Sequence, residues 1–220
     1  MALNAVEEEN IAAIKTWWDE NGKALAAVAI IIFSGYGGWW FWSNSTASQS
    51  MHASDLYEEI LTITREAPDG MINEADRERV LETAQQLRSE HSGTIYAKFA
   101  ALFTAAQAVE VDDLATAESE LQWILDNRRQ GWFGEIDEAL VLTTSLRLGR
   151  IILARGDPER ALSLINGIDP KSYEPGFGEL RGDIYLAMDR LVDARDAYIA
   201  AQESGSNSEL LEMKLSNLPE

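Results

Sequence analysis

A repeated pair of small residues is the feature that most constrains the fold of this chain. In each copy a small residue sits late in a predicted helix, a tight turn follows, and an alanine comes twelve positions after the small residue. Four positions beyond each alanine stands a larger apolar residue. The pairs are Ala105 with Ala117, Gly149 with Ala161, and Gly182 with Ala194, followed by Leu121, Ile165 and Tyr198. Three copies with one spacing predict a structural unit that is used repeatedly.

This layout is typical of two antiparallel helices joined by a tight turn. Helices approach closely only where the facing side chains are small, and a turn aspartate can cap the second helix by accepting from its unpaired backbone N–H groups. The three turns are Val111-Asp112-Asp113, Arg155-Gly156-Asp157 and Met188-Asp189-Arg190. One hairpin cannot bury its own apolar face, so several must stack into a solenoid with a concave surface. The sequence therefore predicts an all-α solenoid of helical hairpins.

Helical periodicity extends across residues 43–220. Apolar residues recur at intervals of three and four, and short Gly, Asp and Pro segments separate stretches rich in Ala, Leu, Glu and Arg. No segment shows a convincing period of two, which would indicate a β-strand. We expect helices at 47–66, 72–91, 94–109, 113–127, 136–155, 158–166, 176–188, 191–203 and 208–217, with loops that include 128–136 and 170–175.

An uncharged run of 19 residues, Ala24 to Trp42, precedes this region. As a helix it would cover about 28 Å, close to the ~30 Å hydrocarbon core of a bilayer. A cleaved signal peptide is the alternative, but the leading residues are acidic, and aromatic residues stand where a signal peptide turns small and polar. We therefore expect a retained transmembrane helix over 24–42, with an outer aromatic belt of Trp39, Trp40 and Trp42.

Basic residues near the two ends of the run predict its orientation. Lys15 and Lys23 precede the run, whereas the first basic residue after it is Arg65. Lys and Arg are enriched in cytoplasmic loops, and this bias sets orientation. We therefore expect residues 1–23 to form a cytoplasmic amphipathic segment, and residues 43–220 to lie across the membrane, in a periplasm or its equivalent.

Small residues inside the run indicate a helix partner. Ser34 and Gly38 form a small-xxx-small pair, which would let the backbone of a neighbouring membrane helix approach closely. The alternative is that these residues have no partner, because glycine is frequent in membrane helices in general.

The composition argues against several classes of function. The net charge is −19, and contact with nucleic-acid phosphates needs clusters of Lys and Arg, so we expect no nucleic-acid partner. The chain has no cysteine, and neither of its two histidines, His52 and His91, has a plausible nucleophile nearby in sequence. The glycine-rich loops lack the spacing of a phosphate-binding loop. We expect no catalytic residue, metal or cofactor, and an anchored hydrolase is the disfavoured alternative.

Aromatic residues in two predicted loops are candidates for protein binding. Trp132 and Phe133 fall in one loop, and Tyr173 and Phe177 fall in or beside another. Aromatic side chains are favoured anchors at protein interfaces. The alternative is that they tuck back into the groove between hairpins and pack in the core.

The repeat resembles the tetratricopeptide repeat. Leu148-Gly149 with Ile152, and Arg181-Gly182 with Tyr185, stand where that family has its L-G-x-x-Y core. The usual early Trp is missing, and the first two copies are 44 residues apart instead of 34. The extra length is expected in the loop from Arg128 to Ile136.

The whole chain is similar to the ancillary subunits of the bacterial SecYEG translocon. The matching segments are Lys15-Thr16-Trp17-Trp18, Glu20 to Ala26, Leu180-Arg181-Gly182-Asp183 and Met213 to Leu218. This resemblance implies a single-span inner-membrane protein with a tetratricopeptide-like periplasmic domain and no enzyme activity. It further implies contact with SecYEG and with a membrane-anchored periplasmic chaperone, and assistance to emerging polypeptides. A tetratricopeptide scaffold of another envelope assembly, such as cytochrome maturation or cell-wall synthesis, is the alternative.

Overall fold

The computed structural model describes residues 50–66, 72–130, 134–135 and 138–218. The chain separates into two compact units, Met1–Met51 and His52–Glu220, and the second contains nearly all of the described residues. The expected cytoplasmic segment and transmembrane helix, with Lys15, Lys23 and the residues of 24–42, lie outside the described ranges. Among the helices within those ranges, none combines the length and the apolar character needed to cross a membrane.

The second unit is a succession of helices, as predicted. A helix over residues 50–66 comes first. The elements that follow are α2 (Glu74–Glu90), α3 (Ile95–Glu110), α4 (Leu114–Asp126), β1 (Arg129–Gln130), β2 (Gly134–Glu135), α5 (Glu138–Ala154), α6 (Pro158–Asn166), η2 (Lys171–Tyr173), α7 (Glu174–Ala187), α8 (Leu191–Glu203) and α9 (Glu209–Ser216). The bounds of α6 and α8 are those expected, and the ends of α2 to α5, α7 and α9 lie within about two residues of the predicted ones.

Two local differences from the prediction have simple causes. The loop at 128–136 contains an antiparallel pair, in which Arg129 lies opposite Glu135 and Gln130 opposite Gly134. Because the loop leaves and returns in opposite directions, its backbone N–H and C=O groups can pair. The expected loop at 170–175 is instead the 3-10 turn η2 running into α7. Proline is tolerated in the first helical turn because the N–H groups there lack intrahelical partners anyway.

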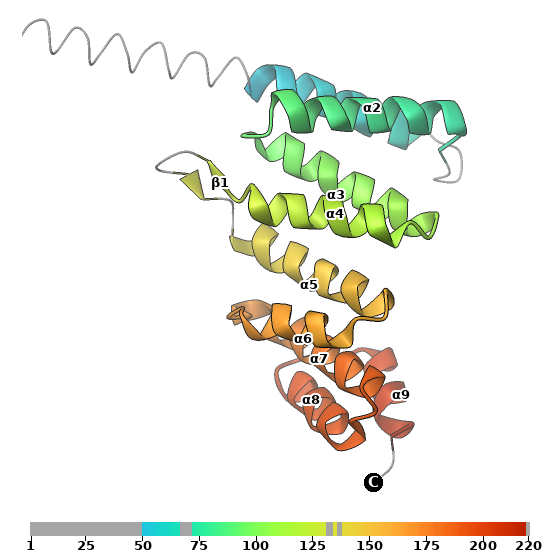
Figure 1. Cartoon of the computed structure of the whole chain (residues 1–220), viewed down its shortest axis with the longest axis vertical. Coiled ribbons are helices and arrows are strands. Elements are labelled where there is room, and N and C mark those ends of the chain that lie inside the picture. The colour runs from blue at the N-terminus through green and yellow to red at the C-terminus, as the bar shows by residue number, and fades with distance from the viewer. Residues whose placement is uncertain (1–49, 67–71, 131–133, 136–137, 219–220) are drawn as a thin grey trace, which may run out of the picture. The chain divides into compact units, whose positions relative to one another are not determined.

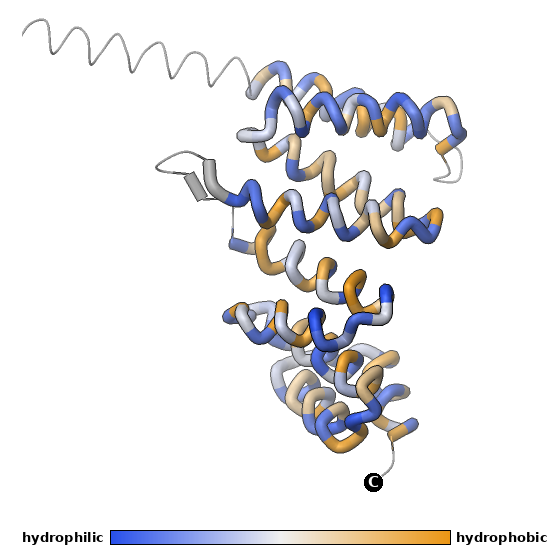
Figure 2. The backbone as a smooth tube through the Cα atoms, in the orientation of Figure 1, coloured by the Kyte–Doolittle hydropathy of each residue, from blue (hydrophilic) through white to orange (hydrophobic). Residues whose placement is uncertain are grey.

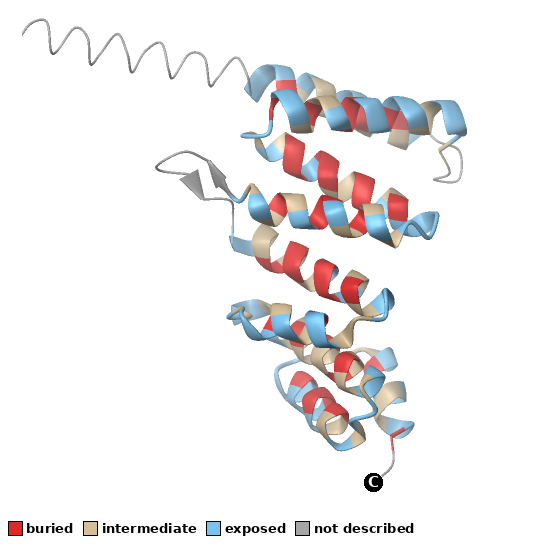
Figure 3. Cartoon of the chain, in the orientation of Figure 1, coloured by how far each residue is buried: buried red, intermediate tan, exposed pale blue. Residues whose placement is uncertain are grey.

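Neighbouring helices pack against each other in chain order (Figure 1). The hairpins are α3–α4, α5–α6 and α7–α8, while α5 also contacts α7 and α9 packs on α8. Apolar residues run through every helix (Figure 2), and buried residues alternate with exposed ones along the stack (Figure 3). The largest buried cluster draws residues from α3, α4, α5, α6 and α7, so its apolar packing joins three successive hairpins.

The three hairpin turns share one backbone geometry. Asp112, Gly156 and Asp189 have φ of 60°, 84° and 58°, in the left-handed region. The next residue in each turn donates its N–H to the carbonyl five positions earlier, as Asp113 does to Ala108 at 2.8 Å and Arg190 to Tyr185 at 2.8 Å. This is the Schellman ending of a helix.

Aspartate caps the second helix in two of these turns but not in the third. The side chains of Asp113 and Asp157 accept from the backbone N–H groups of Thr116 and Arg160, as expected. In the third hairpin the capping position is Arg190, which makes no side-chain capping bond. The expectation that Asp189 caps α8 is wrong, because Asp189 takes the left-handed position that glycine fills in the second turn.

The paired small residues lie where the two helices of each hairpin meet. The alanines of the pairs, Ala105, Ala117, Ala161 and Ala194, are buried. A Cβ atom at Gly182 would lie 2.3 Å from the ring of Tyr198 in the same hairpin. A Cβ atom at Gly149 would lie 3.4 Å from Ile165 of the same hairpin and 2.7 Å from Leu180 Cδ2 of α7, in the next hairpin. Only hydrogen fits at Gly182, because the Tyr198 ring occupies the position of a side chain.

Tyr198 also brings a polar group to this contact, and that group has a partner. Its hydroxyl donates to Asp183 Oδ1 at 2.6 Å, and Lys214 Nζ of α9 donates to the same oxygen at 2.5 Å. Burial, and then the hydrogen bond to Asp183, hold the pKa of Tyr198 far above its usual range. The aromatic ring that requires glycine therefore also links α7 to the last helix.

We predict that Gly182→Ala destabilises the fold by about 1–3 kcal/mol, because the added methyl group overpacks the contact with Tyr198. The same change in a Tyr198→Leu background reproduces the Ala105 and Leu121 pair of the first hairpin, and its cost should disappear. Urea unfolding of the full-length protein in mild detergent, followed by circular dichroism, measures the four free energies of this double-mutant cycle.

Gly167→Ala is the matched control, because a Cβ atom there meets nothing closer than 3.6 Å. Its free energy of unfolding should stay within about 0.5 kcal/mol of the parent. If Gly182→Ala costs the same free energy with and without the Tyr198→Leu change, the clash with the ring is not the cause.

Candidate protein-binding surface

Helix α3 exposes a row of apolar side chains. Its inner face consists largely of alanine, since Ala97, Ala100, Ala101, Ala105 and Ala108 are buried. Its bulky residues lie elsewhere, with Ile95 and Phe99 37% exposed and Val109 45% exposed. Helices that are apolar on all sides are normally buried. We define the α3 stripe as the residues that follow one another at intervals of four and three along this outer face, namely Ile95, Phe99, Leu102, Ala106 and Val109.

A groove between α3 and α5 borders the C-terminal half of the α3 stripe. It has a volume of about 450 Å³, within the usual range of ligand sites. Its lining is mostly aliphatic and includes Leu102, Val109 and Ile151. The polar side chains that line it are Arg147 and Arg150 of α5, which are both exposed. We refer to this site as the α3–α5 groove.

The two arginines give the α3–α5 groove a positive charge on an acidic protein. The chain carries a net charge of −19. None of the ion pairs formed among the described residues involves Arg147 or Arg150. Guanidinium groups bind carboxylates in a bidentate manner. This groove can therefore hold apolar side chains together with a carboxylate.

An aromatic cluster supports the other end of the α3 stripe. The ring of Tyr57, from the helix over 50–66, lies 5.9 Å from that of Tyr96 and 5.8 Å from that of Phe99. Burial raises the pKa of the Tyr57 hydroxyl. These contacts fix Phe99 against the preceding hairpin while leaving part of its ring exposed, which is the arrangement of a preformed apolar anchor.

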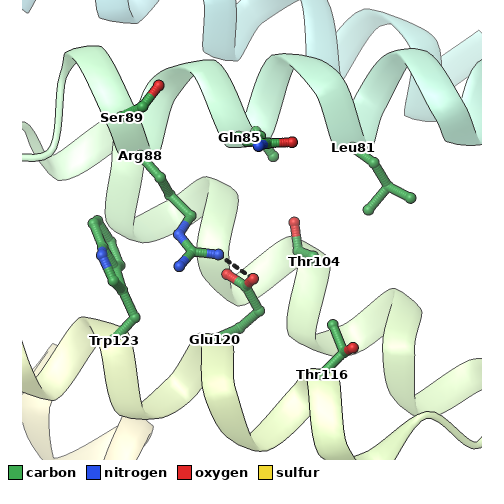
Figure 4. Close-up of a pocket in the computed structure, with 9 residues that line it drawn as sticks. Leu81, Gln85, Arg88, Ser89, Thr104, Thr116, Glu120 and Trp123 are labelled. Carbon is green, nitrogen blue, oxygen red and sulfur yellow. Dashed lines mark hydrogen bonds and ion pairs between the residues drawn. The ribbon is translucent and has the colours of Figure 1, made fainter.

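A second groove lies between α2 and α4, with α3 as its floor (Figure 4). Its volume is about 410 Å³. Arg88 of α2 donates to Glu120 Oε1 of α4 across the groove. Glu120 is only 5% exposed, and its burial raises the pKa of its carboxyl group, although the positive charge of Arg88 opposes this. We refer to this site as the α2–α4 groove.

Trp123 lies at one end of the α2–α4 groove between two cationic side chains. The Arg88 guanidinium is 4.9 Å from the ring centroid and Lys98 Nζ is 5.8 Å from it, so both can make cation–π contacts. Lys98 is fully buried and donates to the Ser92 carbonyl, and burial lowers its pKa. The cluster joins α2, α3 and α4 from residues far apart in sequence.

The structure describes two of the four aromatic residues that were predicted to bind a protein partner. Trp132 and Phe133 lie outside the described residues, so their role in binding stays a prediction. Tyr173 is half-buried in η2 and packs against the main core cluster. Phe177 is 1% exposed within that cluster, so its expected exposure to a partner is wrong and the alternative of core packing holds. The reason is that Phe177 lies on the same face of α7 as Leu180 and Ile184, and this face is buried.

The two histidines come together at the first hairpin. The rings of His52 and His91 are 5.5 Å apart, and His91 is buried at the end of α2. Across the residues that the structure describes, no group of three or more metal-ligating side chains is placed to hold a metal ion. The residues singled out around the membrane run, including Ser34, Gly38, Trp39, Trp40 and Trp42, fall in the part that is not described.

Sequence reasoning misses both grooves. The high proportion of apolar residues in 95–110 is a usable signal for the α3 stripe, because one buried face cannot hold them all. Arg88, Glu120 and Trp123 follow no motif, and nothing in the sequence shows that they are neighbours.

Comparison with known proteins places this architecture in a family. A family model described as a tetratricopeptide repeat-like domain matches residues 15–220. Proteins named ancillary SecYEG translocon subunit are similar along their full length, with 31% identity for the one from Haemophilus influenzae, covering 99% of this chain and 100% of the relative. The proteins of that name from Escherichia coli and Neisseria gonorrhoeae are 28% and 26% identical, and each alignment covers 99% of this chain and 99% or 100% of the relative.

No solved structure gives a significant match to the chain. The family assignment therefore depends on the sequence matches, which run through the repeats and also through the segment before them. The observed hairpins agree with the repeat-like domain that the family model describes. The chain belongs to the family of ancillary SecYEG translocon subunits.

Proposed function

We propose that this protein is a non-enzymatic, membrane-anchored adaptor of the SecYEG translocon, which docks a periplasmic chaperone and assists emerging polypeptides. The observation that carries the proposal is full-length similarity to proteins named as translocon subunits, combined with an exposed apolar stripe beside the two arginines of the α3–α5 groove. Stacked helical hairpins are typical binding scaffolds. An anchor that holds such a scaffold next to the channel raises the local concentration of its partner where chains emerge.

The proposed anchor is the run at 24–42, with residues 1–23 on the cytoplasmic side and the helical unit in the periplasm. Its support is the length of the run and the position of Lys15 and Lys23 before it. Ser34 and Gly38 are the proposed contact with a channel helix.

A photoreactive residue at Gly38 of the full-length protein should crosslink to a subunit of SecYEG in membranes. Immunoblotting against the channel subunits measures the product. The same photoreactive residue placed at Tyr36, two positions away and so on nearly the opposite side of the predicted helix, is the matched control and should crosslink less. Capture at Gly38 of only an unrelated envelope complex would favour the alternative tetratricopeptide scaffold.

The α3–α5 groove is the proposed docking surface for the chaperone or an emerging chain. Its aliphatic walls can take apolar side chains, and Arg147 and Arg150 can pair with an acidic residue beside them. An emerging chain exposes such residues before it folds. The part of the α3 stripe beyond the groove extends the same apolar surface toward the aromatic cluster.

Reversing both charges, with Arg147→Glu and Arg150→Glu, should abolish most of the co-purification of the partner with the full-length protein. The substituted carboxylates repel an acidic segment, and the groove loses its bidentate donors. Quantitative pull-down from detergent-solubilised membranes measures the effect.

The matched control changes the same number of exposed arginines elsewhere, with Arg65→Glu and Arg190→Glu. It shifts the net charge equally and should leave co-purification unchanged. Both variants should unfold within about 0.5 kcal/mol of the parent, because these side chains are on the surface. If both pairs of changes reduce co-purification equally, the cause is the total charge, and the α3–α5 groove is not the docking surface.

Trp132 and Phe133 remain proposed contacts for the same partners. The double change Trp132→Ala with Phe133→Ala should reduce co-purification at an unchanged free energy of unfolding, because interface aromatics contribute strongly to affinity. Pull-down and urea unfolding measure the two quantities. Retention of both partners at normal stability would exclude this loop from binding.

A further inference from the structure

We infer that the α2–α4 groove is a second polypeptide-binding site, which recognises the carboxamide group of an Asn or Gln side chain next to an apolar residue. This site is independent of the α3–α5 groove and of the proposed place at the translocon. The fold buries polar side-chain atoms at this groove without hydrogen-bond partners among the described residues.

Three buried polar atoms in the α2–α4 groove have no hydrogen-bond partner among the described residues. They are Arg88 Nε, Glu120 Oε2 and Thr104 Oγ1. Glu120 and Thr104 are 5% and 6% exposed, and both side chains point toward the space between α2 and α4 (Figure 4). An unpaired buried polar group destabilises a fold, and native structures seldom keep several together. Their grouping at one groove indicates a site for a polar ligand.

The unpaired atoms define the chemistry of that ligand. Arg88 and Glu120 neutralise each other through their ion pair, so the groove favours a neutral group. Arg88 Nε–H can donate, the free Glu120 oxygen can accept, and the Thr104 hydroxyl can do either. A carboxylate or phosphate would be repelled by Glu120, and an ammonium group would be repelled by Arg88. A carboxamide offers an NH₂ group as donor and a carbonyl oxygen as acceptor, so it complements this set.

The walls of the groove determine which kind of residue can bind beside the amide. Leu81 and Ala84 of α2 and the edge of Trp123 are apolar, and the volume of about 410 Å³ is that of a ligand site. The contacts of Trp123 with Arg88 and Lys98 hold its ring in place without an occupant. A polypeptide that presents an apolar residue next to Asn or Gln fits these walls, whereas a small polar metabolite would leave them uncovered.

The test titrates the peptide acetyl-Leu-Asn-Leu-amide into ¹⁵N-labelled full-length protein in detergent micelles. The signal is the indole N–H of Trp123, assigned with a Trp123→Phe variant. We expect a saturable shift. The matched peptide acetyl-Leu-Asp-Leu-amide places a carboxylate where the carboxamide stood, and it should bind roughly tenfold more weakly or worse, because it cannot donate to Glu120.

Two variants examine the groove itself. Glu120→Gln keeps an oxygen for Arg88 but presents an NH₂ group in place of the free acceptor, and it should weaken binding of the Asn peptide roughly tenfold. Gln85→Trp changes an exposed residue at the rim, fills the groove without touching the ion pair, and should abolish the shift. Arg147→Glu, in the other groove, should leave the affinity unchanged.

A saturable shift that depends on the carboxamide and is lost in Gln85→Trp supports the site. Absence of a saturable shift, equal affinity for the Asp peptide, or unchanged affinity in Gln85→Trp overturns it. Because Gln85→Trp leaves the buried pair intact, it decides the question even if Glu120→Gln unfolds. None of these results depends on contact with SecYEG.

Discussion

Close contacts between a small residue on one helix and a larger apolar residue on another determine how closely the helices pack, within the third hairpin at Gly182 and between the second and third hairpins at Gly149. At Gly182 the Tyr198 ring lies where a side chain would stand, so α7 and α8 can meet only because glycine has none. The buried hydroxyl of Tyr198 then requires a polar partner, and Asp183 supplies it while also binding Lys214 of α9. The close contact at Gly182 is thus accompanied by a polar network that links α9 to α7 and α8.

The same requirement explains why large apolar side chains are exposed on α3. Alanines on the inner face of α3 allow close packing against both neighbours, and they leave the bulky residues of the helix to the outer face. Phe99 and Val109 are therefore exposed as a consequence of how the hairpin is built. A scaffold that packs through small residues can present large ones to partners, because its core does not need them.

Sequence alone predicts the elements and their repetition, because small residues, turn aspartates and apolar periodicity are local signals. It fails where one residue type suits two positions, as at Asp189, which takes the left-handed turn position instead of the capping position. Arg190 then stands at the capping position of α8, and its side chain makes no capping bond. Sequence alone also predicts the wrong exposure for Phe177, because the periodicity of the helix expected at 176–188 does not show that the face with Phe177 packs in the core. The sequence does not predict the cluster of Arg88, Glu120 and Trp123, because these residues meet only after α2 and α4 have packed on α3.

The two grooves share α3 but use different sides of it. Leu102 and Thr104 are two residues apart on the helix, so their side chains point in nearly opposite directions, one toward the α3–α5 groove and the other toward the α2–α4 groove. The first groove offers cations and aliphatic walls, while the second offers a neutral set of donors and acceptors. Two segments of one unfolded chain, or two partners, can therefore occupy the protein at once without competing. Because the two proposed occupants differ in chemistry, a chain bound in one groove would raise the local concentration of its next segment at the other groove.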